Sequence, residues 1–80
     1  MNTYETQFFC KCPVNGVRIL YELKISTTSV IPVEELLEHI SANYSDGFHE
    51  KIADDLQIKF GGSQTMSANH HSVTIRTIRP

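Results

Sequence analysis

The chain contains no tryptophan, only two cysteines and three prolines, and no long apolar run. A membrane-spanning helix needs about 20 consecutive apolar residues, so the missing run excludes one. The seven lysines and arginines do not outnumber the nine acidic residues, and the net charge is −2. Nucleic-acid-binding domains usually carry a basic patch, so this balance argues against a nucleic-acid partner.

The two cysteines, Cys10 and Cys12, are separated by one residue. On one strand their side chains would point the same way, about 7 Å apart, which is too far for a disulfide. We therefore expect two free thiols and a reducing compartment. The first residues lack the basic start and apolar core of a signal peptide, so we expect a cytoplasmic protein.

The 80 residues have a 40% apolar and a 20% charged share, as in an ordinary globular domain. This length predicts one domain over residues 1–80, with a core near the lower limit for independent stability. Because no disulfide reinforces that core, we expect a homo-oligomer.

Two strands and a tight turn are predicted at the front of the chain. Residues 3–12 have a mixed strand pattern, and residues 17–25 alternate cleanly between apolar and polar. Asn15-Gly16 between them predicts a two-residue type I′ hairpin turn. That turn would pair Cys12 with Ile19 and hold the thiol rigidly.

Two helices are predicted in the middle. The first has Pro32 in its first turn, followed by apolar positions at Val33, Leu36, Leu37 and Ile40. The second runs from about residue 48 to 60 with Asp46 as a candidate N-cap, and would bury Phe48, Ile52, Ala53, Leu56 and Phe60.

Gly61-Gly62 would end the second helix, and residues 65–79 return to strand character with a turn near residues 68–71. The order strand, strand, helix, helix, strand, strand predicts an α+β fold. Its antiparallel sheet would carry the two helices on one face.

Cys12 is the first candidate for chemistry. Beside a turn and before Pro13, its thiolate could attack an electrophilic carbon. The alternative is a small apolar filler in a strand, which is the usual role of a free cysteine.

The Phe-His-Glu segment at residues 48–50 is the second candidate. Glu50 could accept two N–H donors from a guanine-like or pterin-like ring, or could simply stabilise the start of the helix. His49 could transfer a proton beside it, or lie on the surface.

The histidines and cysteines do not have the spacing of a zinc motif, so no metal site is assigned. One alternative remains open: Cys10 and Cys12 could share a metal with His70 or His71 if the outer strands adjoin. A solvated turn at His70-His71 is the simpler interpretation.

These motifs, in this order of elements, resemble the tunnelling-fold superfamily. The closest likeness is to the 7-cyano-7-deazaguanine (preQ0) reductase group and its amidinotransferase-like relatives. Those proteins carry Cys-Pro-x-x-Gly and Phe-His-Glu segments, which match residues 12–16 and 48–50 here. The resemblance implies that Cys12 forms a thioimide with a nitrile, Glu50 and Phe48 hold a deazaguanine ring, and His49 assists proton transfer.

The same resemblance implies an oligomeric barrel with ligand pockets between subunits, and NADPH as reductant. Two positions depart from the family. Ile19 stands where the family has an aspartate, seven residues after the cysteine, and residues 26–32 lack the lysine of the cofactor segment. The residues themselves therefore predict no cofactor.

Residues 68–76 resemble a segment of the GTP cyclohydrolase I family, another tunnelling-fold group. Ser72 replaces that family's zinc-ligating cysteine, so this likeness supports the fold and not metal-dependent hydrolysis.

Three functions stay open. The chain could be a preQ0 reductase-like enzyme of deazapurine (queuosine) metabolism. It could be a purine- or pterin-binding module with reduced catalysis, including a GTP cyclohydrolase-like protein. It could also be a structural oligomer without a ligand.

Overall fold

Four strands form one antiparallel sheet in the computed structural model, which describes residues 1–80. The elements in chain order are β1 (Asn2–Lys11), β2 (Arg18–Thr27), α1 (Val33–Asn43), α2 (His49–Phe60), β3 (Ser63–His70) and β4 (Val73–Arg79). The strand order in the sheet is also β1-β2-β3-β4, so β1 and β4 are its two edges. The α+β class and the predicted order of elements are confirmed.

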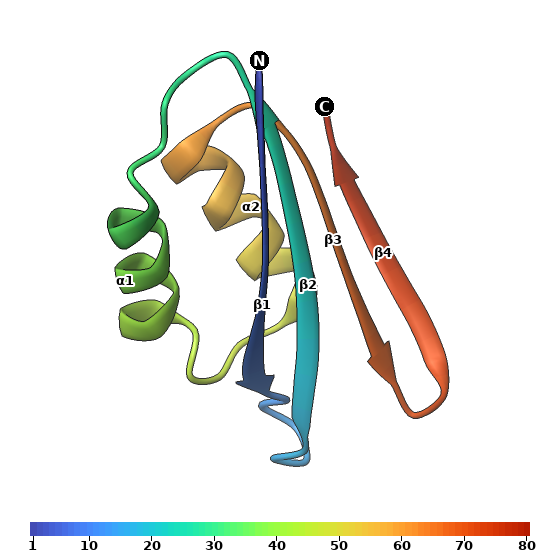
Figure 1. The fold of residues 1–80 in the computed structure, drawn as a ribbon. Coiled ribbons are helices and arrows are strands. Elements are labelled where there is room, and N and C mark those ends of the chain that lie inside the picture. The colour runs from blue at the N-terminus through green and yellow to red at the C-terminus, as the bar shows by residue number, and fades with distance from the viewer.

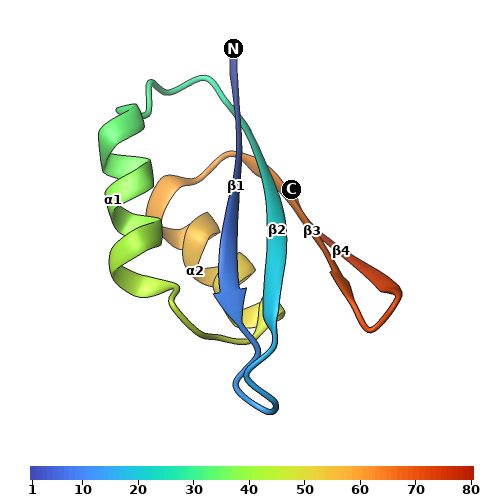
Figure 2. The same cartoon turned by 60° about the horizontal axis from the view of Figure 1, so that its bottom comes forward.

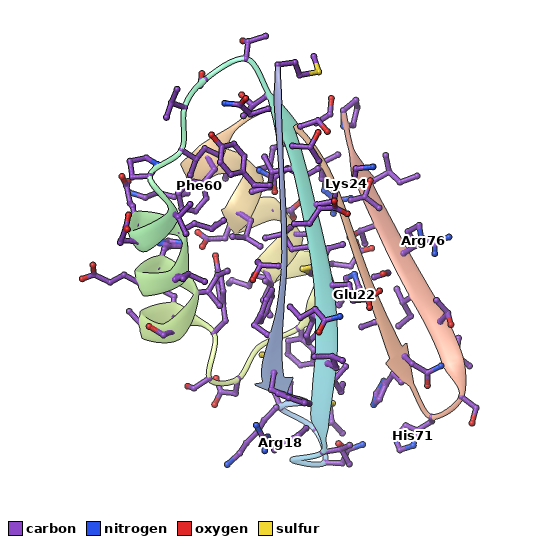
Figure 3. The ribbon with its side chains drawn as sticks, viewed as in Figure 1. Arg18, Glu22, Lys24, Phe60, His71 and Arg76 are labelled. Carbon is purple, nitrogen blue, oxygen red and sulfur yellow. The ribbon has the colours of Figure 1, made fainter.

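Both helices lie on one face of the sheet, and the opposite face is left uncovered (Figure 1). The alternating pattern of β2 explains this arrangement, because every second side chain from Ile19 to Ile25 is buried. Ile25, Leu56, Met66 and Cys10 are the largest fully buried side chains. The uncovered face carries polar side chains, among them Glu22, Lys24 and Arg76 (Figure 3).

Helix α1 begins at Val33, after Pro32 as its N-cap residue. Only two of its four predicted apolar positions, Leu36 and Ile40, are buried, whereas Val33 and Leu37 are 52% and 50% exposed. Consecutive residues of a helix are turned by about 100°, so Val33 and Leu37 form a second stripe beside the buried one. Neither helix is long and apolar enough to cross a membrane.

Helix α2 begins one residue later than the sequence suggests, and two expectations about its start are wrong. Phe48 is the N-cap residue with an extended backbone, and its side chain is 56% exposed, not buried. Asp46 does not cap the helix; it forms an isolated parallel bridge with Lys11. The other end is as predicted, because Gly61 closes the helix with a φ of 69°.

The predicted register between β1 and β2 is also wrong. Ile19 pairs with Cys10 and not with Cys12, and residues 12–17 form a longer connection. Only Gly16 has a positive φ there, whereas a type I′ turn needs positive φ at both central residues. Asn15 acts through its side chain, whose Oδ1 accepts from the N–H of Val17 at 3.1 Å. The register differs by two residues, so each side chain keeps its predicted face.

The tight hairpin turn lies instead between β3 and β4. His71 and Ser72 have φ values of 52° and 70°, and they link His70 directly to its partner Val73. The predicted turn at residues 68–71 is therefore placed too early, since residues 68–70 belong to β3. This turn projects away from the helices (Figure 2).

Candidate functional site

A concavity of about 550 Å³ lies at the end of the sheet that carries both hairpin connections. Its walls come from the β1–β2 connection, the start of α2, the inner face of β2 and the β3–β4 end; half of its 14 lining residues are hydrophobic. All four site residues predicted from the sequence line it: Cys12, Phe48, His49 and Glu50. They belong to two segments more than thirty residues apart in the chain.

A backbone clamp brings these segments together. The N–H of Lys11 donates to the carbonyl oxygen of Ser45 at 3.0 Å, and the N–H of Gly47 donates to the carbonyl oxygen of Lys11 at 3.2 Å. These bonds hold the α1–α2 connection against the end of β1. As a result, the start of α2 lies beside Cys12.

The two thiols differ in their surroundings. Cys12 lines the concavity, and its backbone is fixed by hydrogen bonds with Val17 (2.9 Å) and Gly16 (2.8 Å). Cys10 is 1% exposed and does not line the concavity. Burial raises the pKa of the Cys10 thiol, and the nearby Asp46 carboxylate raises it further. Cys12 is therefore the thiol placed for chemistry with a ligand.

His49 is half-buried and hydrogen-bonded on one side only. Its Nε2 lies 3.2 Å from the carbonyl oxygen of Met66 and 3.1 Å from Oγ1 of Thr77, whereas its buried Nδ1 has no partner. Burial lowers the pKa of His49, which favours the neutral ring. Because a carbonyl only accepts hydrogen bonds, Nε2 carries the proton and Nδ1 is an acceptor.

Glu50 extends from the first turn of α2, and its side chain is 78% exposed. Arg79 approaches it only to 3.9 Å, because the Nε of Arg79 is bound to Asp54 at 2.8 Å. The Glu50 carboxylate is thus free to accept N–H donors from a ligand. The exposed ring of Phe48 offers an adjacent apolar surface.

His70 at the end of β3 and His71 in the β3–β4 turn also line the concavity. Their rings lie 4.4 Å apart, and Nε2 of His71 is 3.1 Å from Nδ2 of Asn15, which links the two hairpin ends. Figure 3 shows His71 at this end of the sheet. The buried Nε2 of His70 has no partner in the protein.

The metal set left open by the sequence is not assembled. It required the outer strands to adjoin, but β1 and β4 are opposite edges of the sheet. No group of three or more His, Cys, Asp or Glu side chains is placed to hold a metal ion.

Sequence reasoning missed two contributors to this site. Tyr21 was assigned to the buried face of β2 but not to the site, and its ring lies 5.2 Å from that of His49. Burial raises the pKa of Tyr21 to about 12, so its hydroxyl stays protonated. Thr77 supports His49 from β4. A threonine at an inward position of an alternating strand is the signal that would have identified it.

Comparison of the chain with models of protein families, with curated proteins and with solved structures finds no match. The resemblance to the tunnelling fold therefore remains an expectation drawn from the short motifs.

Proposed function

We propose that the chain binds a small planar heterocycle of the 7-deazaguanine type in this concavity. One observation carries the proposal: two distant segments with the expected motifs line the same hollow. The Glu50 carboxylate would accept the adjacent N–H donors of the ring edge, and Phe48 would cover the ring.

The lining favours a free base over a nucleotide. It contains no lysine or arginine, and Glu50 is its only carboxylate. Arg18, which pairs with Lys11 at the end of the β1–β2 ladder, has its guanidinium carbon 4.4 Å from the centre of the Phe9 ring. A triphosphate would find no fixed cation here, which counts against the GTP cyclohydrolase-like alternative.

With a nitrile-bearing ring such as preQ0, we propose a covalent step at Cys12. The thiolate sulfur adds to the nitrile carbon, one C–N π bond breaks, and the nitrogen takes the proton that the thiol lost. The product is a thioimide, so atoms balance and no reductant is needed. Ile19 pairs with Cys10 and cannot donate a proton, so we assign the proton transfer to His49, as the Phe-His-Glu resemblance implies.

The residues do not fit NADPH, so we propose no reduction. The segment that the resemblance assigns to this cofactor, residues 26–32, has no lysine. It also begins at the opposite end of β2 from Ile19 and Tyr21, which line the concavity.

Incubation of the full chain with preQ0 tests both parts of the proposal. Intact mass spectrometry should show an adduct equal to the mass of preQ0, and the Cys12→Ala variant should show none. Glu50→Gln should weaken binding in calorimetry by about 30-fold, because it loses a charge-assisted hydrogen-bond acceptor. Glu34→Gln is the matched control, since Glu34 also lies in the first turn of a helix but outside the concavity.

The second candidate is a binding module without covalent chemistry. It is favoured by the absence of any lysine or arginine from the lining of the concavity, because such a cation facing the Cys12 thiol would stabilise a thiolate. It predicts ring binding that depends on Glu50 and is unchanged in Cys12→Ala. Absence of binding to wild-type protein by preQ0, guanine and pterin would contradict both candidates.

We also propose that the chain forms a homo-oligomer. Strands β1 and β4 each have one unpaired edge, and the exposed β4 residues include Val73 and Ile78, at 61% and 65%. Free edges and exposed apolar side chains promote association. Light scattering that gives the monomer mass of 9.1 kDa would contradict this proposal.

A further inference from the structure

Hydrogen bonds from the sheet hold the ring of His49, with partners on β3 and β4. Oγ1 of Thr77 lies 3.1 Å from Nε2 of His49 and 3.3 Å from the carbonyl oxygen of Met66. Nε2 of His49 is itself 3.2 Å from that same carbonyl oxygen. Three polar groups from α2, β3 and β4 therefore meet in the interior.

Only one arrangement of protons makes all three contacts hydrogen bonds. The carbonyl of Met66 can only accept, so the Thr77 hydroxyl donates its single proton there. The Thr77 oxygen then has only lone pairs to offer His49, and it accepts from Nε2–H. In the neutral ring, the proton is consequently on Nε2 and Nδ1 is bare.

Thr77 is an unusual residue for its position. It is 6% exposed on the inward face of β4, where Ile75 is its neighbour on the same face. Packing alone would accept a valine there, which has nearly the same shape. The hydroxyl is fully used in the hydrogen bonds to His49 and Met66, which points to a positioning role.

We propose that Thr77 is a positioning residue that, with the Met66 carbonyl, locks His49 in its Nε2–H tautomer and so makes Nδ1 the acceptor nitrogen of the ring. The unpaired state of Nδ1 is the second observation behind this proposal, since a buried nitrogen without a partner is costly unless a ligand or a proton serves it. The use of Nδ1 in catalysis rests on the proposed function.

In the covalent step, Nδ1 of His49 would act first as the general base and then as the general acid. Nδ1 takes the proton from the Cys12 thiol as sulfur adds to the nitrile carbon, and then returns it to the imine nitrogen. The proton thus moves from sulfur to nitrogen with no other donor, which compensates for Ile19 at the family's aspartate position. The charged or titratable groups near the His49 imidazole are Glu50 on α2, Arg79 on β4 and Tyr21 on β2.

Nitrogen NMR of the histidine rings in the ligand-free protein tests the tautomer directly. At neutral pH we expect the spectrum of wild-type protein to show His49 protonated at Nε2 and bare at Nδ1. A proton on Nδ1, or a doubly protonated ring, would overturn the proposal. This measurement needs no ligand and no variant.

Thr77→Val and Thr77→Ala remove the hydroxyl, and Thr77→Ser keeps it. The Met66 carbonyl still favours Nε2–H in the first two variants, so we expect a measurable minor share of the Nδ1–H tautomer there and the pure wild-type tautomer in the third. If both hydroxyl-free variants keep a pure Nε2–H tautomer, Thr77 does not position the ring. Two variants of different size are used so that one packing defect cannot decide the result.

The rate of adduct formation with preQ0 then tests the catalytic role. We expect it to fall in Thr77→Val in proportion to the share of the Nδ1–H tautomer, by about twofold for an even mixture, and to recover in Thr77→Ser, because a misplaced proton removes base catalysis. An unchanged rate in Thr77→Val would reject that role. If wild-type protein forms no adduct while its tautomer is as expected, the proposed enzymatic function fails and the positioning of His49 by Thr77 stands.

Discussion

The backbone of Lys11 is joined to that of Ser45 by an N–H to carbonyl hydrogen bond of 3.0 Å. Lys11 is the last residue of β1, and Ser45 lies in the connection between the helices. The contact places the start of α2 beside Cys12 without any side chain of either motif taking part. The candidate site is therefore assembled by main-chain hydrogen bonds next to it.

The first prediction concerns the two thiols. In the folded protein, iodoacetamide should modify Cys12 at least about tenfold faster than Cys10. Cys12 is also largely buried, at 8% exposure, but it lines the concavity, whereas Cys10 is 1% exposed and its pKa is raised by burial. Peptide mapping by mass spectrometry measures both rates.

The control for this experiment is the Cys12→Ala variant, which should remain unmodified until denaturant is added. Equal modification of both cysteines under native conditions would show that the surroundings of the thiols do not differ as described.

The second prediction is a loss of stability in weak acid that depends on His49. Burial holds the pKa of His49 below its ordinary value of 6.5, so the unfolded chain binds a proton at a higher pH than the folded chain does. The free energy of unfolding should fall as the pH drops below 6.5. Urea denaturation at several pH values measures it.

The His49→Gln variant should lose this part of the pH dependence, and His71→Gln, at an exposed turn position, serves as the matched control. An identical pH profile in wild-type protein and His49→Gln would mean that His49 makes no contribution in this range.

The third prediction concerns the glycine pair that follows α2. Gly61 and Gly62 both have positive φ, at 69° and 72°. A Cβ on Gly62 would lie 2.6 Å from the carbonyl oxygen of Ser26, whereas one on Gly61 would meet nothing within 4 Å. Gly61 has a ψ of −161°, in a region that essentially only glycine adopts, so we expect a cost of about 2 kcal/mol for Gly61→Ala. For Gly62→Ala we expect a larger cost, on the order of 4 kcal/mol, because the clash with Ser26 adds to the strain.

Thermal and urea unfolding of the two variants measure this difference. A loss of stability in Gly62→Ala no larger than that in Gly61→Ala would contradict the close approach of β2 to Gly62.

The fourth prediction concerns the contact between the end of α1 and α2. The hydroxyl of Tyr44 donates to Oδ2 of Asp55, and Nε2 of His39 lies 3.2 Å from the same oxygen. The Tyr44 hydrogen bond is the main cause that holds the pKa of Asp55 below its ordinary 3.8. Tyr44→Phe should raise that pKa and cost about 1 kcal/mol of stability.

Carbon NMR of the Asp55 carboxyl group and urea denaturation test the two effects. Since the pKa is depressed in the folded state, the contribution of Asp55 is present above pH 3.8 and is lost as the pH falls further. An unchanged titration in Tyr44→Phe would contradict the hydrogen bond.

The sequence determined which elements form, because their signals are local. The alternation from Ile19 to Ile25 specifies a strand with one buried face, and the Gly61-Gly62 pair specifies the end of a helix. The sequence also indicated Cys12, Phe48, His49 and Glu50 as site candidates, because their residue types suit ring binding and thiol chemistry.

Only the tertiary structure decided where these elements meet. The sequence placed a type I′ turn at Asn15-Gly16, but the two consecutive positive φ values occur at His71 and Ser72. The connection of residues 12–17 is instead shaped by contacts such as the hydrogen bond from Asn15 to His71. Such contacts join residues far apart in the chain, so no local pattern records them.

Contacts between distant residues also explain why the sequence did not predict the exposure of Phe48 or the role of Thr77. The spacing of Phe48 suggested a buried helical position, but the clamp on Lys11 holds it before the helix and leaves it exposed. The inward position of Thr77 can be read from the alternation of β4, but its hydrogen bond to His49 exists only because β4 packs against α2. Local residue type determined the elements and the candidates, whereas long-range hydrogen bonds and packing decided which candidates share a site.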